Sequence, residues 1–75
     1  MKHRYRVDNI GSKKWPVAVS CQVGWLDANA YWHKEQIEQW LEDNGIEYDA
    51  KQDAKVFIWY LRNTEAATMF MLRWA

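Results

Sequence analysis

Cysteine, proline and glycine are scarce in this sequence. Its 75 residues include one cysteine, one proline and three glycines. The single cysteine, Cys21, cannot form an internal disulfide, so the fold has to rest on a hydrophobic core. No CxxC, HxxxH or other paired Cys/His spacing is present, which argues against the common zinc motifs. Three scattered glycines also exclude a glycine-rich phosphate loop.

Net charge and long apolar runs are missing as well. Ten lysine and arginine residues balance ten aspartate and glutamate residues, whereas a nucleic-acid-binding domain is usually clearly basic. No apolar run approaches the roughly 18–20 residues of a membrane-spanning helix, so no membrane partner is expected. Because the sequence has neither a cysteine framework nor the charged-then-apolar start of a signal peptide, we expect a cytoplasmic protein.

Aromatic residues are abundant instead. Six Trp, four Tyr and two Phe make up 16% of the chain, and each buried ring removes about 150–250 Å² from water. This composition predicts a folded protein, since disordered chains are poor in aromatics and carry a high net charge. At this length we expect one small domain, residues 1–75, that buries only about 60–65% of its unfolded surface.

Alternation of polar and apolar residues predicts four strands. The first covers residues 3–9 and the second residues 17–23, in which Val17, Val19, Cys21 and Val23 share one face. The other two lie in "IEYDAK" and "AKVFIWYL" and are joined at Gln52-Asp53. Both faces of the last strand are apolar, with Phe57 and Trp59 on one face and Ile58 on the other. This strand is therefore expected at the centre of the sheet.

Two helices complete the predicted fold. The first has Asp27 or Asn29 as its cap and ends at Asn44-Gly45, because glycine adopts the left-handed conformation that terminates helices. Its core stripe contains Leu26, Ala30, His33, Ile37, Trp40 and Leu41, whereas Glu35, Glu38 and Glu42 lie away from the stripe and are expected in solvent. The second helix begins after a cap at Asn63 or Thr64.

The order strand, strand, helix, strand, strand, helix predicts the fold class. Its last five elements match a split βαβ, ferredoxin-like arrangement that lacks the closing strand. The first strand can fill that vacancy, beside the strand at residues 17–23. We therefore predict an α+β fold, a permuted ferredoxin-like two-layer sandwich in which two helices cover one face of a four-stranded antiparallel sheet.

The second helix predicts an interface. At 100° per residue, Ala66, Ala67, Phe70 and Trp74 cluster toward the sheet, whereas Met69 and Leu72 fall on the other side, with Met71 between. A helix that is apolar all round is normally buried all round, and a domain of this size has little to cover it. We expect a second copy of the chain, in a homodimer, or another protein to cover Met69, Leu72 and Met71. Trp32 lies outside the core stripe and is expected to cover a neighbouring edge or to add an exposed contact.

A nucleic-acid-associated module is the second hypothesis. Residues 1–14 carry five positive charges and one negative charge, from Lys2, Arg4, Arg6, Lys13 and Lys14 against Asp8. Phe57 and Trp59 point the same way on the expected central strand, as do the rings that stack bases in RNA-recognition sheets. The neighbouring strand offers no aromatic residue and the chain is neutral. We therefore rank this hypothesis second and expect weak, salt-sensitive binding.

Catalysis is not expected. Cys21 and His33 are the only thiol and imidazole in the middle of the chain, and both fall on the core faces of their elements. Reactive thiols lie in accessible, electropositive places, so this pair is interpreted as structural. The sequence thus predicts no catalytic residue, no metal and no cofactor.

The segment "LRNTEAATMFMLRWA" resembles the ending of small uncharacterised proteins encoded by tailed bacteriophages of marine bacteria. In these proteins a strand, an Asn-containing turn and an Ala-xx-Phe-x-Leu-Arg-Trp helix close the chain. The segment is about a fifth of the sequence, and the matching residues are Asn63, Ala67, Phe70, Leu72, Arg73 and Trp74. The resemblance implies a phage or environmental origin, an unassigned function, a location in the host cytoplasm and a host or phage protein as partner.

Overall fold

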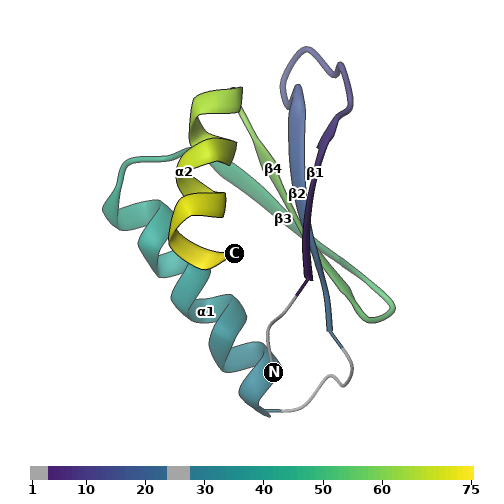
Figure 1. The fold of residues 1–75 in the computed structure, drawn as a ribbon, viewed down its shortest axis with the longest axis vertical. Helices are drawn as coiled ribbons and strands as arrows, with labels where there is room; N and C mark the ends of the chain where they lie inside the picture. Colours follow the sequence, from purple (N-terminus) through teal and green to yellow (C-terminus); the bar gives the residue numbers. More distant parts are fainter. Residues whose placement is uncertain (1–3, 24–27) are drawn as a thin grey trace.

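A computed structural model describes residues 4–23 and 28–75 of the chain (Figure 1). Six elements follow one another in the predicted order, namely β1 (Arg4–Asn9), β2 (Val17–Gln22), α1 (Ala28–Asp43), β3 (Tyr48–Asp53), β4 (Val56–Leu61) and α2 (Thr64–Trp74). Of the sequence predictions, those for Lys2, Leu26 and Asp27 fall outside the described residues.

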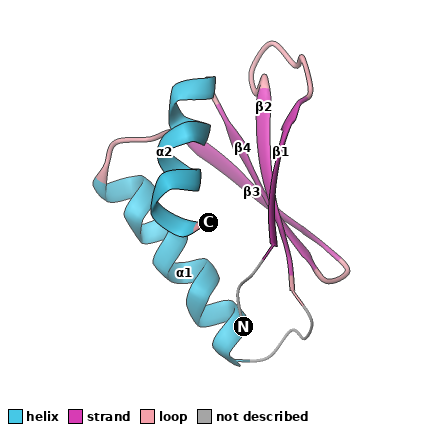
Figure 2. Ribbon diagram, viewed as in Figure 1, coloured by secondary structure: helices cyan, strands magenta, loops and turns pink. Residues whose placement is uncertain are grey.

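The four strands form one sheet in the order β1-β2-β4-β3, and every neighbouring pair is antiparallel. Both helices cover the same face of this sheet (Figure 2). β4 is central, and β1 fills the place beside β2 that the split βαβ arrangement leaves open. The structure therefore confirms the predicted α+β, ferredoxin-like sandwich.

The core lies between the sheet and the two helices. The largest side chains without solvent exposure are Trp59 and Phe57 of β4 and Phe70 of α2. Phe70 packs on Trp59 with ring centroids 5.3 Å apart, and on Tyr5 and Trp40 at 5.6 and 6.4 Å. Aromatic rings are thus the three largest fully buried side chains in the described core.

The two ends of α1 differ in how well the sequence predicts them. Asn29 lies inside the helix, which begins at Ala28, so Asn29 is not the cap. At the other end Gly45 has a φ of 66°. The amide of Gly45 donates to the carbonyl of Glu42, and that of Ile46 donates to Leu41 over 2.9 Å. This pair of bonds is a Schellman motif, and it confirms the predicted stop at Gly45.

Glu38 does not lie in solvent as expected. Its side chain is only 19% exposed; Oε2 accepts a hydrogen bond from Trp59 Nε1 at 3.1 Å and lies 2.6 Å from Lys34 Nζ. The physical reason is that a buried indole N–H needs an acceptor, and Glu38 is the side chain of α1 that reaches it. Glu35 and Glu42 are exposed as expected.

The turn between β3 and β4 lies two residues later than predicted. The strands remain paired through Asp53↔Val56, so Ala54 and Lys55 form the turn rather than Gln52 and Asp53. Ala54 has a φ of 51°, a left-handed conformation that alanine rarely adopts. No glycine or asparagine marks this turn in the sequence, so local turn chemistry does not predict its position.

Candidate interaction surface

α2 has a buried side and an exposed side, as its periodicity predicts. Ala66, Ala67 and Phe70 are buried against the sheet, whereas Met69 is 44% and Leu72 82% exposed. Asn63 caps the helix, because its side-chain oxygen accepts a hydrogen bond from the amide of Ala66 at 2.8 Å. The cap fixes the start of α2, and the burial of Phe70 against the sheet leaves Leu72 on the exposed side.

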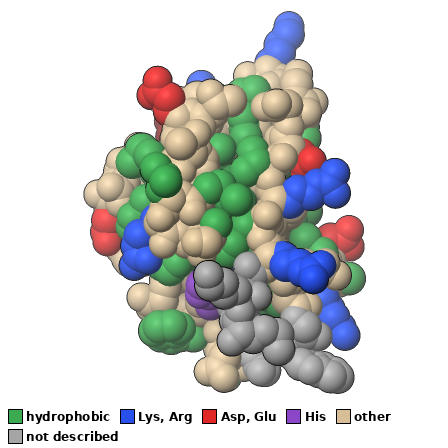
Figure 3. All heavy atoms as spheres, in the orientation of Figure 1, with side chains coloured by type: hydrophobic (Ala, Val, Ile, Leu, Met, Phe, Trp, Pro, Cys, Tyr) green, Lys and Arg blue, Asp and Glu red, His purple; other side chains and the backbone are tan. Residues whose placement is uncertain are grey.

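An apolar groove runs between α2 and β1, and we call it the edge groove. It has a volume of about 360 Å³ and is lined by Val7 and Asn9 of β1 and by Thr64, Ala67, Thr68, Met71 and Leu72 of α2. Hydrophobic side chains are visible along the furrow between these two elements (Figure 3). Met71 and Leu72, two of the residues predicted from the sequence, therefore lie in one hollow together with Val7.

One side of the edge groove is formed by β1, which is an edge strand of the sheet. Among the described strands, β1 has a neighbour on one side only, and Val7 is 41% exposed. A strand in this position presents unpaired amide and carbonyl groups, which pair readily with another strand. The groove thus combines apolar side chains with a free strand edge.

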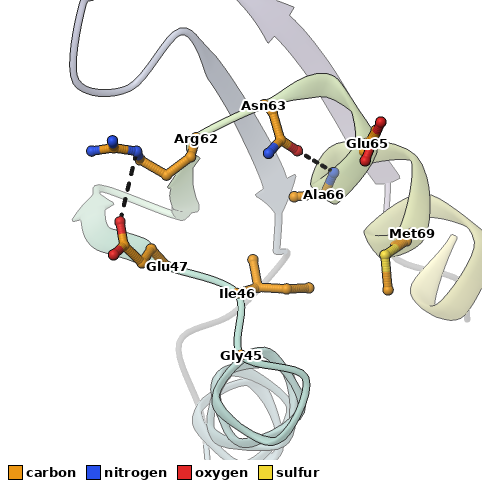
Figure 4. Close-up of a pocket in the computed structure, with 8 residues that line it drawn as sticks. All are labelled: Gly45, Ile46, Glu47, Arg62, Asn63, Glu65, Ala66 and Met69. Carbon is orange, nitrogen blue, oxygen red and sulfur yellow. Dashed lines mark hydrogen bonds and ion pairs between the residues drawn. The ribbon is translucent and has the colours of Figure 1, made fainter.

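Met69 lies beside a different hollow. A pocket of about 410 Å³ is bordered by Met69 and Glu65 of α2, and its other wall includes Ile46 and Glu47. Figure 4 shows these lining residues. At the rim of the pocket, Arg62 Nε lies 3.6 Å from the carboxylate of Glu47. The structure therefore separates Met69 from Met71, because the two side chains project from opposite flanks of the helix.

Trp32 belongs to neither hollow. It lies on α1, and 61% of its surface is exposed. Of its two predicted roles, the exposed position applies. Whether it contacts a partner stays a prediction.

The aromatic half of the predicted nucleic-acid surface is wrong. Phe57 and Trp59 have no solvent exposure, because they lie on the face of β4 that both helices cover, so bases cannot stack on them. Arg4, Arg6, Lys13 and Lys14 are exposed, and Arg6 forms an ion pair with Asp8 at 3.0 Å. A role for these basic residues in phosphate binding stays a prediction.

Cys21 and His33 lie near each other, but Tyr5 connects them. The hydroxyl of Tyr5 lies 2.5 Å from Nε2 of His33, while Cys21 has no solvent exposure. Burial raises the pKa of the Cys21 thiol to about 11, and a hydrogen bond with Tyr5 offsets only part of this shift. The lack of exposure confirms the predicted burial of Cys21, and the raised pKa does not favour nucleophilic chemistry at this thiol.

Two further features are absent from the described ranges 4–23 and 28–75. These ranges contain no group of three or more His, Cys, Asp or Glu side chains arranged to hold a metal ion. They also contain no helix of the length and apolarity needed to cross a membrane.

Comparison of the chain with protein families, with curated proteins and with solved structures found no match.

Sequence periodicity identifies Leu72 and Met71 as residues of the candidate surface. It does not identify Val7 or Asn9 as their neighbours, since β1 and α2 are at opposite ends of the sequence. Only the alternation of Tyr5 and Val7 with charged residues indicated that one face of β1 is apolar.

Proposed function

We propose that this chain is a small non-catalytic interaction protein that self-associates through the edge groove. The observation that carries the proposal is the position of Leu72, which is 82% exposed beside an apolar groove and a free strand edge. A second copy of the chain is the partner to which we commit, and a host or phage protein is the alternative outcome of the test.

Burial of apolar surface supports this proposal. Covering a leucine side chain completely contributes about 1.5–3 kcal/mol, and a two-fold dimer buries the same residue on both copies. The partly exposed Val7 and Met71 line the same groove. An exposed apolar patch beside an open strand is unfavourable in water and is typical of interaction sites.

Sedimentation over a wide range of concentrations tests the proposal with two matched variants. Leu72→Glu places a charge in the edge groove and is expected to give a monomer, because a charge buried at an apolar interface without a partner is strongly unfavourable. Met69→Glu makes a similar change on the flank of α2 that faces away from the edge groove, beside the other pocket, and is expected to remain a dimer. Circular dichroism should show that both variants are folded.

An original chain that stays monomeric at the highest concentrations would rule out self-association. If both glutamate variants dissociate, the interface covers the whole outer side of α2 rather than the edge groove. A monomeric original chain that nevertheless captures one host or phage protein, with capture lost in Leu72→Glu, would identify the alternative partner.

A further inference from the structure

We propose that the second copy joins edge to edge, so that β1 pairs antiparallel with β1 of the partner subunit and Val7 lies on the two-fold axis. The two four-stranded sheets then become one continuous sheet, with all helices on the same face. This inference rests on the proposed self-association and adds its geometry, namely which strand pairs, in which direction and in which register.

Backbone hydrogen bonds show which groups of β1 are free for pairing. The amide of Ile10 donates to the carbonyl of Pro16 at 2.9 Å, at the end of a regular register that runs from Arg4↔Gln22 to Asn9↔Val17. Residues along an antiparallel strand alternate in the direction of their amide and carbonyl groups. The even-numbered residues of β1 therefore bond to β2, and Tyr5, Val7 and Asn9 direct their groups to the free edge.

Symmetry restricts the register to a few choices. Residues directly opposite each other in an antiparallel pair have side chains on the same face of the sheet. A two-fold axis perpendicular to the sheet must therefore pass midway between one residue and the same residue of the partner subunit. We describe that residue as lying on the axis. With Val7 on the axis, Tyr5 pairs with the partner's Asn9, and all three outward residues of β1 make bonds. With Arg6 or Asp8 on the axis, one of the three loses its partner within the strand.

Charge selects the same register. On the open face of the sheet, the Val7 register places Arg6 opposite Asp8 of the partner subunit, and the two-fold axis repeats this pair. An axis through Arg6 would place two arginines opposite each other, and an axis through Asp8 would do the same with two aspartates. Opposite charges stabilise directly facing positions, and like charges destabilise them.

The apolar side chains fit the same arrangement. Val7 is on the helix-covered face, since its neighbour across β2 is the buried Val19. With Val7 on the axis, the edge grooves of the two copies meet there. The exposed Leu72 of each copy then lies beside apolar side chains of both subunits. The charged pairs and the apolar contacts are thus on opposite faces of the joined sheet.

Disulfide cross-linking tests the register. Val7→Cys places two thiols opposite each other at the axis, within the separation that a disulfide spans. Under mild oxidation it is expected to give a covalent dimer on a denaturing gel. The matched control, Asn9→Cys, lies on the same strand edge but faces the partner's Tyr5, so it is expected to stay a monomer on the gel. The original chain, with its buried Cys21, provides the background.

Charge exchange tests the pairing separately. Arg6→Asp and Asp8→Arg each bring like charges together and are expected to weaken the dimer about tenfold or more, as measured by sedimentation. Mixed in equal amounts, the two variants restore opposite charges at both positions, so a mixed dimer should form. Affinity tags of two sizes would identify it on a native gel.

Each outcome supports or overturns the inference. Strong cross-linking of Val7→Cys with none of Asn9→Cys supports it. If the original chain is a dimer but Val7→Cys cross-links no faster than Asn9→Cys, the register is wrong and self-association stands. If the original chain is a monomer in sedimentation, the proposed function fails together with this inference.

Discussion

Two buried indole N–H groups are treated differently in this core. Trp59 donates to Glu38, whose charge is offset by Lys34 at 2.6 Å. Trp74 Nε1 is also shielded from water but has no hydrogen-bond partner among the described residues. Its ring instead packs edge-to-face with His33 at 5.5 Å and with Trp40 at 6.3 Å, and the guanidinium of Arg73 lies 4.1 Å from its centroid. An unsatisfied donor of this kind destabilises a fold by about 1–3 kcal/mol.

The two tryptophans should therefore respond differently to the same substitution. Trp59→Phe removes a hydrogen bond to a charged group and leaves the largely buried Glu38 with one partner fewer. We expect it to lower the free energy of unfolding by about 2–3 kcal/mol. Trp74→Phe removes an unsatisfied donor along with some packing area, so we expect a loss below about 1 kcal/mol. Urea unfolding followed by circular dichroism measures both, and a larger loss for Trp74→Phe would contradict this explanation.

Among the elements, the β3–β4 hairpin is where a non-glycine residue of the described ranges 4–23 and 28–75 has a positive φ. Ala54 adopts a φ of 51°, and a left-handed conformation costs a residue with a Cβ atom about 1–2 kcal/mol. The surrounding strands hold it in place, since Asp53 and Val56 pair directly across the turn. Pairing of the two strands thus stabilises the hairpin, whereas the turn itself is unfavourable.

A glycine in this turn should stabilise the protein. Ala54→Gly relieves the left-handed backbone but increases the freedom of the unfolded chain, so we expect a net gain of about 0.5–1 kcal/mol. The matched control is Ala50→Gly in β3, where the backbone is extended, and this variant should be less stable than the original. Thermal unfolding compares the two. A lower midpoint for Ala54→Gly would show that the turn is not strained.

The sequence predicts the elements better than their boundaries. Alternation in the strands and the glycine after α1 are properties of whole segments or of one residue with a single role, and those predictions are correct. The start of α1, the turn at Ala54 and the burial of Glu38 depend on individual dihedral angles or on a side chain 21 positions away. No local pattern contains that information.

The same limit applies to the candidate surface. Helical periodicity alone separates Phe70 from Leu72, because both lie on one element. It does not reveal that Val7 lies beside Leu72, which depends on the position of β1 in the sheet. Nor could alternation decide which face of β4 the helices cover, because both faces are apolar. The aromatic half of the nucleic-acid hypothesis was wrong for this reason.

At the scale of the whole molecule, the sheet consists of two hairpins joined through β2 and β4. Each hairpin connects strands that are adjacent in sequence. The junction pairs Val17 with Leu61 and Gln22 with Val56, so all of α1 and β3 lie between the paired strands along the chain. Contacts between distant parts of a chain form late, because the connecting segment must first lose its freedom.

This junction makes the protein's folding rate depend on the meeting of the two hairpins. A single hairpin forms within about 1–10 μs, whereas closure of the β2–β4 pair has to wait for the segment between them. Val19→Ala, at the junction opposite Trp59, is expected to slow refolding in stopped-flow experiments. Ala54→Gly should change the refolding rate little. If Val19→Ala only accelerates unfolding, the hairpins meet after the rate-limiting step, and the transition state of this small sandwich lies within one of them.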